Sequence, residues 1–322
     1  MKVLVTAVGS NTAIGIIKAL RLTNDVYIVG IDVNKAHLCA GAKLVDEFVT
    51  TPVFSDKDAY TETLLNLVRN KKIACVIPVH DSEIEVVAEM KEAFPDATFW
   101  AVNSREIISV CNNKKLSNKK ALEAGLKVPR WYDKIEQPSI NCPVIVKPLD
   151  GVSSRGISKV ESREELEKIL GEDEDDLIIQ EFVEDAVEYT IDAYSTYGGK
   201  YYGCVVRERI ETRNGMSTKG VVVDDAKLEM LVQDYLNKLG FKGMSNLQFF
   251  KKNEEFYFIE INPRFSGGGI LSVAANFNSP AFTLMEAKGE ALPAFDRVDI
   301  KTGLFMTRYY EESFAYAENA SV

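Results

Sequence analysis

The chain has 322 residues, 46% of them apolar, and its 38 basic and 48 acidic residues give a formal net charge of −10. This length predicts two to three domains, and because no apolar run approaches the ~20 residues of a membrane span we expect no membrane partner. The acidic balance argues against a nucleic-acid partner, and five scattered cysteines without a CxxC spacing indicate reduced thiols in a cytoplasmic protein.

Residues 1 to about 108 alternate between short apolar strands and helices with apolar residues at helical spacing. We expect strands at residues 3–7, 26–32, 74–78 and 98–102, and helices at residues 13–22, 60–70 and 83–94. Strands that alternate with helices form parallel sheets covered on both faces. The first part of the chain is therefore predicted to be a Rossmann-like α/β domain.

Two positions in this part are candidates for substrate binding. The loop after the first predicted strand reads VGSNTAIG, and Asn11 and Ile14 stand where a dinucleotide-binding loop starting at Gly9 needs glycines. We therefore expect no dinucleotide, although the helix start at Asn11 can hold an anionic group of another ligand. His80 follows the third predicted strand, and the ends of parallel strands face ligands.

The composition changes at about residue 111. A basic helix ended by Gly125 precedes strands that we expect at residues 144–147, 177–181, 189–195, 201–209, 247–251 and 256–261, with helices at 162–170 and 227–239. Runs of strands with few helices between them predict an α+β half. The acidic run at residues 172–176 is interpreted as a solvated loop.

A lysine and a loop of small residues form the first candidate site in this half. Lys147 ends an apolar strand, where a charge is costly unless it has a partner. The loop behind it offers hydroxyl groups and backbone amides from Gly151, Ser153, Ser154 and Gly156. Such an arrangement binds phosphate, but a tight hairpin with a snorkelling lysine would give the same pattern.

The segment from residue 180 to residue 188 has the side chains to surround a flat ring. A carboxylate accepts hydrogen bonds from an exocyclic amine, backbone amides can bind a ring nitrogen, and a second carboxylate can hold two ribose hydroxyls. The candidates are Gln180, Glu181, Phe182, Val183 and Glu188. A surface acidic loop is the alternative interpretation.

A predicted hairpin carries the candidate metal site. If strands 247–251 and 256–261 form a hairpin that turns at Asn253-Glu254, Gln248 and Glu260 fall near opposite each other. Asn262 points to the same side as Glu260, and oxygen ligands of this kind suit Mg²⁺, with phosphate oxygens completing its shell. Arg264 follows on that side, where a guanidinium can hold a phosphoryl oxygen.

The ordered set of these motifs resembles the ATP-grasp superfamily. It comprises Asn113-Lys114, PVIVKPLDGVSSRG, QEFVE, QFF and EINPRFSGG. More narrowly, it is similar to single-domain relatives of the carbamoyl-phosphate synthase large chain and to amino-acid ligases such as the one in pyrrolysine biosynthesis. The resemblance implies a Rossmann-like pre-ATP-grasp domain at 1–110 and an ATP-grasp fold of two α+β subdomains at 111–303. The smaller subdomain is expected at about 125–185, and residues 304–322 would be a C-terminal extension.

The resemblance also implies roles for the candidate residues. Lys114 and Lys147 would contact ATP phosphates under the loop at 151–156, Glu181 and the backbone of Val183 would bind adenine, and Glu188 would hold the ribose. Gln248, Glu260 and Asn262 would bind Mg²⁺, or alternatively Mn²⁺, and Arg264 would stabilise the transferring phosphoryl group. Two positions depart from the family pattern, because Asn113 replaces the usual aspartate and Asp185-Ala186 stands where a glycine is often found.

Four basic residues of the segment VVRERIETRNGMSTKGVVV stand out in an acidic protein, namely Arg207, Arg209, Arg213 and Lys219. Arg207 and Arg209 share one side of a predicted strand. We expect Arg207 and Lys219 to act in catalysis and Arg209 to bind an acidic co-substrate above the active site. The alternative is a solvated hairpin with ordinary charges.

The expected function is an ATP- and Mg²⁺-dependent carboxylate–amine ligase that acts through an acylphosphate and releases ADP and phosphate. Its partners would be a small-molecule carboxylate and an amine, without a glutaminase domain in the chain, and a homodimer is compatible with this activity. One alternative is a carbamoyl-phosphate synthase-like kinase that uses bicarbonate or carbamate. Another is a non-catalytic ATP-binding regulatory module.

Overall fold

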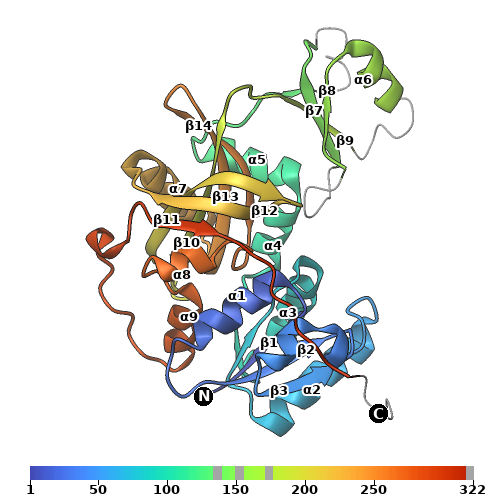
Figure 1. Ribbon diagram of the computed structural model, residues 1–322, viewed down its shortest axis with the longest axis vertical. Helices are drawn as coiled ribbons and strands as arrows, with labels where there is room; N and C mark the ends of the chain where they lie inside the picture. The colour runs from blue at the N-terminus through green and yellow to red at the C-terminus, as the bar shows by residue number, and fades with distance from the viewer. Residues whose placement is uncertain (133–139, 149–155, 171–176, 317–322) are drawn as a thin grey trace.

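The computed structural model describes residues 1–132, 140–148, 156–170 and 177–316, and these residues form three units, each built on one β-sheet (Figure 1). The predicted phosphate-loop residues Gly151, Ser153 and Ser154, and the acidic run at 172–176, lie outside the described residues. None of the helices in the described ranges combines the length and apolar character that crossing a membrane requires.

The N-terminal unit contains a five-stranded parallel sheet with strand order β3-β2-β1-β4-β5. Its strands are β1 (Lys2–Val5), β2 (Tyr27–Asp32), β3 (Glu47–Thr50), β4 (Cys75–Ile77) and β5 (Phe99–Trp100). Its helices are α1 (Asn11–Leu20), α2 (Lys57–Lys71), α3 (Asp81–Ala93) and α4 (Arg105–Asn112), with 3₁₀ turns η1 (Ala36–Leu38) and η2 (Ala40–Lys43). The predicted parallel α/β arrangement is confirmed, while β3 and α4 were not predicted.

Alternate residues of β1 belong to different hydrophobic clusters. Val3 and Val5 pack with α1, whereas Leu4 packs with α2 and α3, so both faces of the sheet are buried. The strand order reverses at β1, so the loops after β1 and β4 start side by side. Ligands of open parallel sheets bind at this switch point, and Asn11 and His80 follow these two strands.

The central unit is a six-stranded antiparallel sheet with strand order β14-β13-β10-β11-β12-β15. Its strands are β10 (Val187–Ser195), β11 (Tyr201–Arg213), β12 (Met216–Val223), β13 (Gly243–Lys252), β14 (Glu255–Asn262) and β15 (Phe305–Thr307). The helices around it are α5 (Lys114–Glu123), α7 (Ala226–Leu239), α8 (Ile270–Ala274) and α9 (Ser279–Ala287), with a 3₁₀ turn η4 (Arg297–Asp299). The strands β12 and β15 and the helices α8 and α9 were not predicted.

One hydrophobic cluster joins the first two units. It contains Val3 and Val5 of β1 together with Tyr194 of β10, Val205 of β11 and Leu271 of α8. Because a packed interior does not deform continuously, this shared core holds the carboxyl edge of the parallel sheet in a defined position against the central sheet.

The predicted basic helix is shorter than expected, and a separate helix precedes it. Asn113 lies between α4 and α5 in an extended conformation, and its side chain accepts a hydrogen bond from Leu116 N at 2.9 Å. This N-cap starts α5 at Lys114. Gly125, which has a φ of +91°, follows the helix in the conformation that favours glycine.

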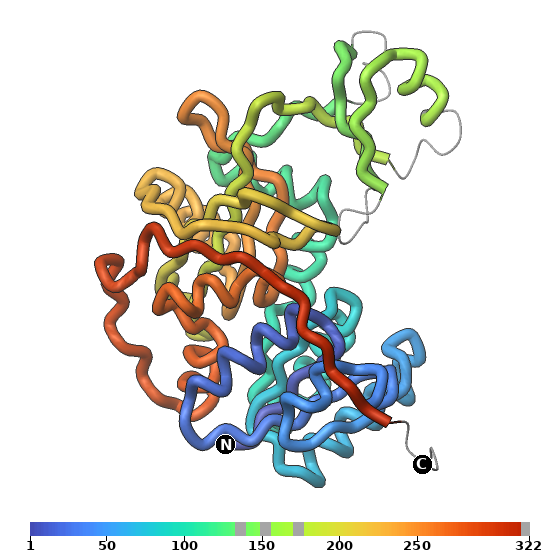
Figure 2. The backbone as a smooth tube through the Cα atoms, in the orientation of Figure 1, coloured from blue at the N-terminus to red at the C-terminus, as the bar shows by residue number. Residues whose placement is uncertain are grey.

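A small four-stranded sheet with strand order β6-β9-β7-β8 forms the third unit. It consists of β6 (Trp131–Tyr132), β7 (Val144–Pro148), β8 (Ser158–Val160), β9 (Leu177–Glu181) and helix α6 (Arg163–Leu170). Figure 1 shows it at the far end of the molecule from the N-terminal sheet. The tube in Figure 2 shows the last described residues returning from the central sheet, along β15, across the N-terminal unit.

Candidate active site

A cleft of about 940 Å³ lies between the N-terminal unit and the central sheet. Both units contribute residues to the walls of the cleft. No single sequence motif therefore predicts which residues line it. Its lining includes Ser10, Asn11, Thr12, His80, Asp81, Asn112, Lys114, Gly215, Met216, Asn246, Gln248, Glu260, Asn262, Arg264 and Gly267.

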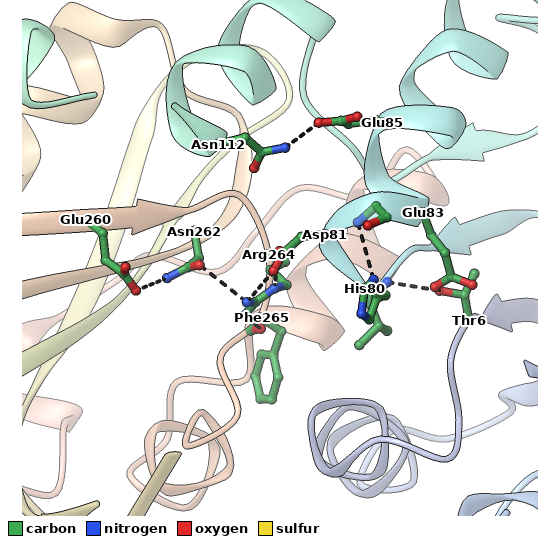
Figure 3. A network of polar contacts seen from close by, with 12 residues as sticks. Thr6, His80, Asp81, Glu83, Glu85, Asn112, Glu260, Asn262, Arg264 and Phe265 are labelled. Atoms are coloured by element: carbon green, nitrogen blue, oxygen red, sulfur yellow. Dashed lines mark hydrogen bonds and ion pairs between the residues drawn. The ribbon is translucent and has the colours of Figure 1, made fainter. Parts of the chain in front are cut away.

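Alternate residues of β14 and the residue two positions beyond it form a hydrogen-bonded row into this cleft (Figure 3). Asn262 Nδ2 donates to Glu260 Oε1 at 3.1 Å, and Arg264 Nη2 donates to Asn262 Oδ1 at 3.3 Å. Arg264 also donates from Nε and Nη2 to the two carboxylate oxygens of Asp81, at 2.7 and 3.0 Å. This bidentate pair fixes the direction of the guanidinium and links the central sheet to α3.

Burial and pairing act on Arg264 in opposite directions. Burial lowers the pKa of Arg264, but the attraction and hydrogen bonds of Asp81 raise it by more, so the pKa ends above its ordinary value. The group is therefore permanently cationic.

Gln248 of β13 faces Glu260 directly in the strand register, which confirms the predicted hairpin. Gln248 Nε2 donates to Glu260 Oε1 at 2.8 Å. Arg209 Nη1 donates to Gln248 Oε1 at 3.0 Å and forms an ion pair with Glu188. Asn253 and Glu254, with φ values of 49° and 61°, make the turn of this hairpin.

The donor set around Glu260 suits a magnesium ion shared with nucleotide phosphates. It offers one carboxylate and two amide oxygens, and Mg²⁺ is commonly bound by one or two carboxylates with phosphate oxygens. In this structure the amide nitrogens of Gln248 and Asn262 face Glu260, so each amide would turn by half a revolution to present its oxygen. Within the described residues, no three His, Cys, Asp or Glu side chains gather into a metal site of their own.

Two lysines approach this row from other elements. Lys114 is the first residue of α5 and lines the cleft, while Lys147 of β7 is 5% exposed. Burial lowers the pKa of Lys147 to about 8, with the attraction of Glu260 raising it and the repulsion of Lys114 lowering it. Lys114 of α5 and Glu260 of β14 therefore both lie within electrostatic reach of Lys147 on β7.

The predicted adenine-binding residues stay together on the small sheet and the turn after it. Glu181 Oε2 accepts a hydrogen bond from Arg130 N at 3.1 Å, and Gln180 Nε2 donates to Pro129 O at 3.2 Å. The ring centroid of Phe182 lies 4.4 Å from Lys159 Nζ, and the side chain of Val183 is buried. Gly156, in the predicted phosphate loop, has a φ of +74° that favours glycine.

The structure separates the three basic candidates of the β11–β12 hairpin. Arg207 is 1% exposed and donates to Asp192 and Ser266, and Arg209 is held by Glu188. Lys219 is exposed and pairs with Glu211 at 2.7 Å, and it is not among the residues that line the cleft. The hairpin is thus partly buried, because its strands lie inside the central sheet.

Sequence reasoning missed Asp81, the partner of Arg264. A signal was present, because Asp81 directly follows His80 at the end of a buried strand, next to the switch point of the sheet. His80 lines the cleft as expected, where its ring stacks on Phe54 and caps α3 by accepting from Ser82 N. Asn11 also lines the cleft, beside Met216.

The carboxylate of Asp32, which could imitate a ribose-binding acid, is engaged by the chain itself. It accepts hydrogen bonds from Gly9 N at 2.9 Å and from Asn34 N at 2.9 Å. Asp32 therefore joins the loop after β1 to the end of β2 by a hydrogen bond, although a dinucleotide-binding protein would use an acidic residue at this place to bind the ribose.

Comparison with known proteins identifies the fold family. Residues 111–268 match the family model described as ATP-grasp domain, and residues 3–99 match the model described as PylC-like, N-terminal domain. Residues 111–268 belong to the ATP-grasp family. This membership confirms the resemblance drawn from the ordered motifs, and the Rossmann-like unit followed by antiparallel sheets agrees with it.

Curated relatives are identical to this chain at about a quarter of the aligned positions. Formate-dependent phosphoribosylglycinamide formyltransferase of Wolinella succinogenes is 25% identical over 255 residues, covering 72% of this chain and 64% of the relative. The carbamoyl phosphate synthase large chain of Thermotoga neapolitana is 26% identical over 229 residues, covering 64% of this chain and 20% of the relative. The chain thus spans less than two thirds of the length of these relatives.

Solved structures share the fold over nearly the whole ATP-grasp chain. The biotin carboxylase domain of Hydrogenobacter thermophilus 2-oxoglutarate carboxylase superposes with a TM-score of 0.76 at 18% identity, covering 94% of this chain and 73% of that one. N5-carboxyaminoimidazole synthetase from Staphylococcus aureus, in complex with ADP, has a TM-score of 0.72 at 16% identity, with coverages of 91% and 78%.

Proposed function

We propose that the protein is an ATP- and Mg²⁺-dependent carboxylate–amine ligase that forms an acylphosphate and releases ADP and phosphate. The observation that carries this proposal is the row Glu260–Asn262–Arg264 in the cleft, which Lys114 also lines, with Lys147 within electrostatic reach of Glu260. Metal ligands, phosphate-binding cations and a fixed guanidinium together suit phosphoryl transfer, which depends on positioning and charge neutralisation.

In this proposal the residues of the chain bind and orient the reactants. Lys114 and Lys147 bind ATP phosphates, and Gln248, Glu260 and Asn262 hold Mg²⁺, whose charge neutralises the phosphate oxygens. An oxygen of the substrate carboxylate attacks the γ-phosphorus, the bond from that phosphorus to the bridging oxygen breaks, and ADP leaves. The amine then attacks the acyl carbon and displaces phosphate. Arg264, oriented by Asp81, stabilises the negative charge that develops in both steps.

The base and ribose of ATP would bind at the small sheet and β10. We assign adenine to Glu181 and the backbone of Val183, and the ribose to Glu188. Burial raises the pKa of Glu188, with Arg209 lowering it and Glu260 raising it, and the net shift is upward. Ribose binding would have to compete with the Glu188–Arg209 ion pair for this carboxylate.

The decisive experiment measures ADP and AMP formation from Mg·ATP with panels of carboxylic acids, amino acids and bicarbonate. We expect ADP, and formation of AMP would exclude the acylphosphate route. Glu260→Gln should abolish turnover with the circular dichroism spectrum retained. Glu254→Gln is the matched control, because Glu254 lies in the turn of the same hairpin with its side chain 86% exposed.

A carbamoyl-phosphate synthase-like kinase is the second candidate, because one curated relative carries that name. Bicarbonate alone would then stimulate ADP formation without any carboxylic acid. If Mg·ATP binds but no acceptor supports turnover, the protein is a binding module instead.

The partners in this proposal are a small-molecule carboxylate and a small-molecule amine. We also expect a homodimer, since one structural neighbour is described as a biotin carboxylase domain dimer. Light scattering coupled to size-exclusion chromatography tests this, and a mass near the 35.9 kDa of one chain would contradict it.

A further inference from the structure

A small side pocket of about 30 Å³ adjoins the cleft, between the β11–β12 hairpin and the loop after β14. It shares Gly215, Met216, Asn246, Gln248 and Gly267 with the wall of the cleft. Its lining contains two arginines and no carboxylate. The full lining is Thr190, Arg207, Arg209, Gly215, Met216, Ser217, Asn246, Gln248, Ser266, Gly267 and Gly268.

Arg209 lines this pocket with an incomplete set of hydrogen bonds. Its side chain is 6% exposed, and its Nη1 forms an ion pair with Glu188 and donates to Gln248 Oε1 at 3.0 Å, while Nη2 donates to Gly215 O at 2.7 Å. Its Nε is buried and has no hydrogen-bond partner among the described residues. A buried donor of a charged group without an acceptor is costly. The Nε is closed to solvent in this structure, and an anionic oxygen that gained access to this edge of the guanidinium would relieve that cost.

Arg207 supplies a second, rigid cation on the same wall. Its Nε and Nη2 are fixed by Asp192 and Ser266 at 3.0 Å each, so it is held in place independently of any ligand. A Cβ at position 268 would come within 2.7 Å of Arg207 Nη1, and Gly268 is therefore needed to leave room at this end of the guanidinium.

A third guanidinium reaches the loop from the C-terminal segment. Arg308, directly after β15, donates to Gly267 O, and its Nε is also buried without a partner in the described ranges. Burial lowers the pKa of Arg308, and the repulsion of Arg207 lowers it further. Two cations, Arg207 and Arg308, therefore lie beside the turn at Gly267-Gly268.

We propose that this side pocket binds a non-reacting carboxylate of the amine substrate, which would make the acceptor an α-amino acid. A planar carboxylate matches the Nε–Nη2 edge of Arg209 with two parallel hydrogen bonds, and it would replace Gly215 O on Nη2. The pocket volume suits a group of this size and excludes a nucleotide.

The location separates this carboxylate from the one that is phosphorylated. Gln248 lies in the walls of both the pocket and the cleft, between Arg209 and Glu260. A carboxylate bound by Arg209 would thus lie next to Gln248, which is itself a proposed metal ligand, while the amine of the same molecule could extend into the cleft. This assignment rests on the proposed ligase function.

The test measures equilibrium binding by calorimetry in the presence of Mg·ADP. The twenty standard amino acids are screened first, and the tightest ligand is then compared with its α-carboxamide, which keeps the amine and the side chain. We expect the carboxamide to bind about 10- to 100-fold more weakly, as for other hydrogen bonds to charged groups. Arg209→Gln should remove this difference, and Arg209→Lys, which retains the charge without the planar fork, should retain part of it.

Arg213→Gln is the matched control, because Arg213 lies on the same strand with its side chain 67% exposed and lines neither pocket. It should leave the preference for the carboxylate unchanged. If Arg209→Gln does not fold, the comparison of Arg209→Lys with Arg213→Gln still decides the matter. Equal binding of acid and amide to the unmodified protein, or an unchanged preference in the folded Arg209 variants, would overturn the proposal.

The outcomes also distinguish this inference from the proposed function. Amino-acid binding that depends on Arg209 without ADP formation would exclude the ligase but support the pocket. ADP formation that is stimulated equally by an amino acid and its amide would support the ligase and exclude the pocket. Binding of bicarbonate that depends on Arg209, with no binding of amino acids, would assign the pocket to bicarbonate and overturn the proposal.

Discussion

Nucleotide binding to this protein should depend on pH because of Lys147. The pKa of Lys147 is about 8, well below its ordinary value of 10.5, chiefly because the side chain is buried. Below pH 8 the ammonium group is charged and can pair with a phosphate. Above pH 8 the Lys147 amine is mostly neutral, so binding of a phosphate next to it must be accompanied by protonation of Lys147 from solution.

The size of the effect follows from this pKa. At pH 9 about one molecule in eleven still carries the charged lysine, against about ten in eleven at pH 7, so the Kd for Mg·ADP should be about tenfold weaker at pH 9. Binding at pH 9 should also take up close to one proton. Protons are taken up and not released on binding, because the negative charge of a phosphate raises the pKa of a neighbouring lysine.

Isothermal titration calorimetry at pH 6.5 to 9.5, in buffers of different ionisation enthalpy, measures both quantities. Lys147→Arg is the matched variant, because arginine stays charged throughout this range, and its Kd should hardly change with pH. Lys147→Met should bind weakly at every pH. A wild-type Kd that is constant from pH 7 to 9.5, with no proton uptake, would refute the assignment of Lys147 to phosphate.

Three further predictions concern the cleft and its support. Glu260→Gln should lower the rate of Mg²⁺-dependent ADP formation at least about 100-fold, and a rate within a factor of two of wild type would remove the metal assignment. Asp81→Asn should lower kcat for ADP formation about tenfold or more with little change in nucleotide Kd, because Arg264 loses its bidentate partner; an equal loss in Kd would mean that Asp81 acts on binding instead. Asp192→Ala should destabilise the central sheet by about 3–5 kcal/mol, measured by hydrogen exchange of its amides, because it leaves a buried arginine uncompensated. Arg163→Gln breaks an exposed ion pair and should lower the free energy of unfolding by only about 0.5 kcal/mol. Equal losses of stability in Asp192→Ala and Arg163→Gln would contradict the importance of burial.

Much of the fold could be predicted because its signals are local. The spacing of apolar residues before residue 108 predicts the alternation of strands and helices. The β13–β14 hairpin is predicted by side chains that alternate between polar and apolar on both sides of a turn at Asn253-Glu254. The register of the turn alone would pair Gln248 with Ile259, and an irregularity of the ladder between Gln248 and Phe249 shifts it so that Gln248 faces Glu260. The strand β12 and the edge strand β15 were missed, because mixed polar sequence becomes a strand only when a neighbour offers its hydrogen bonds.

The sequence by itself therefore determined the family, the order of its units and the row of polar side chains on β14. The tertiary structure decided which charges meet. Arg264 pairs with Asp81, 183 residues away, and the buried Arg207 is bound by Asp192. Such partners depend on how separate sheets pack, and no local pattern encodes that packing. For the same reason only the folded chain shows that Lys147, on the small sheet, is buried near Glu260 and has a lowered pKa.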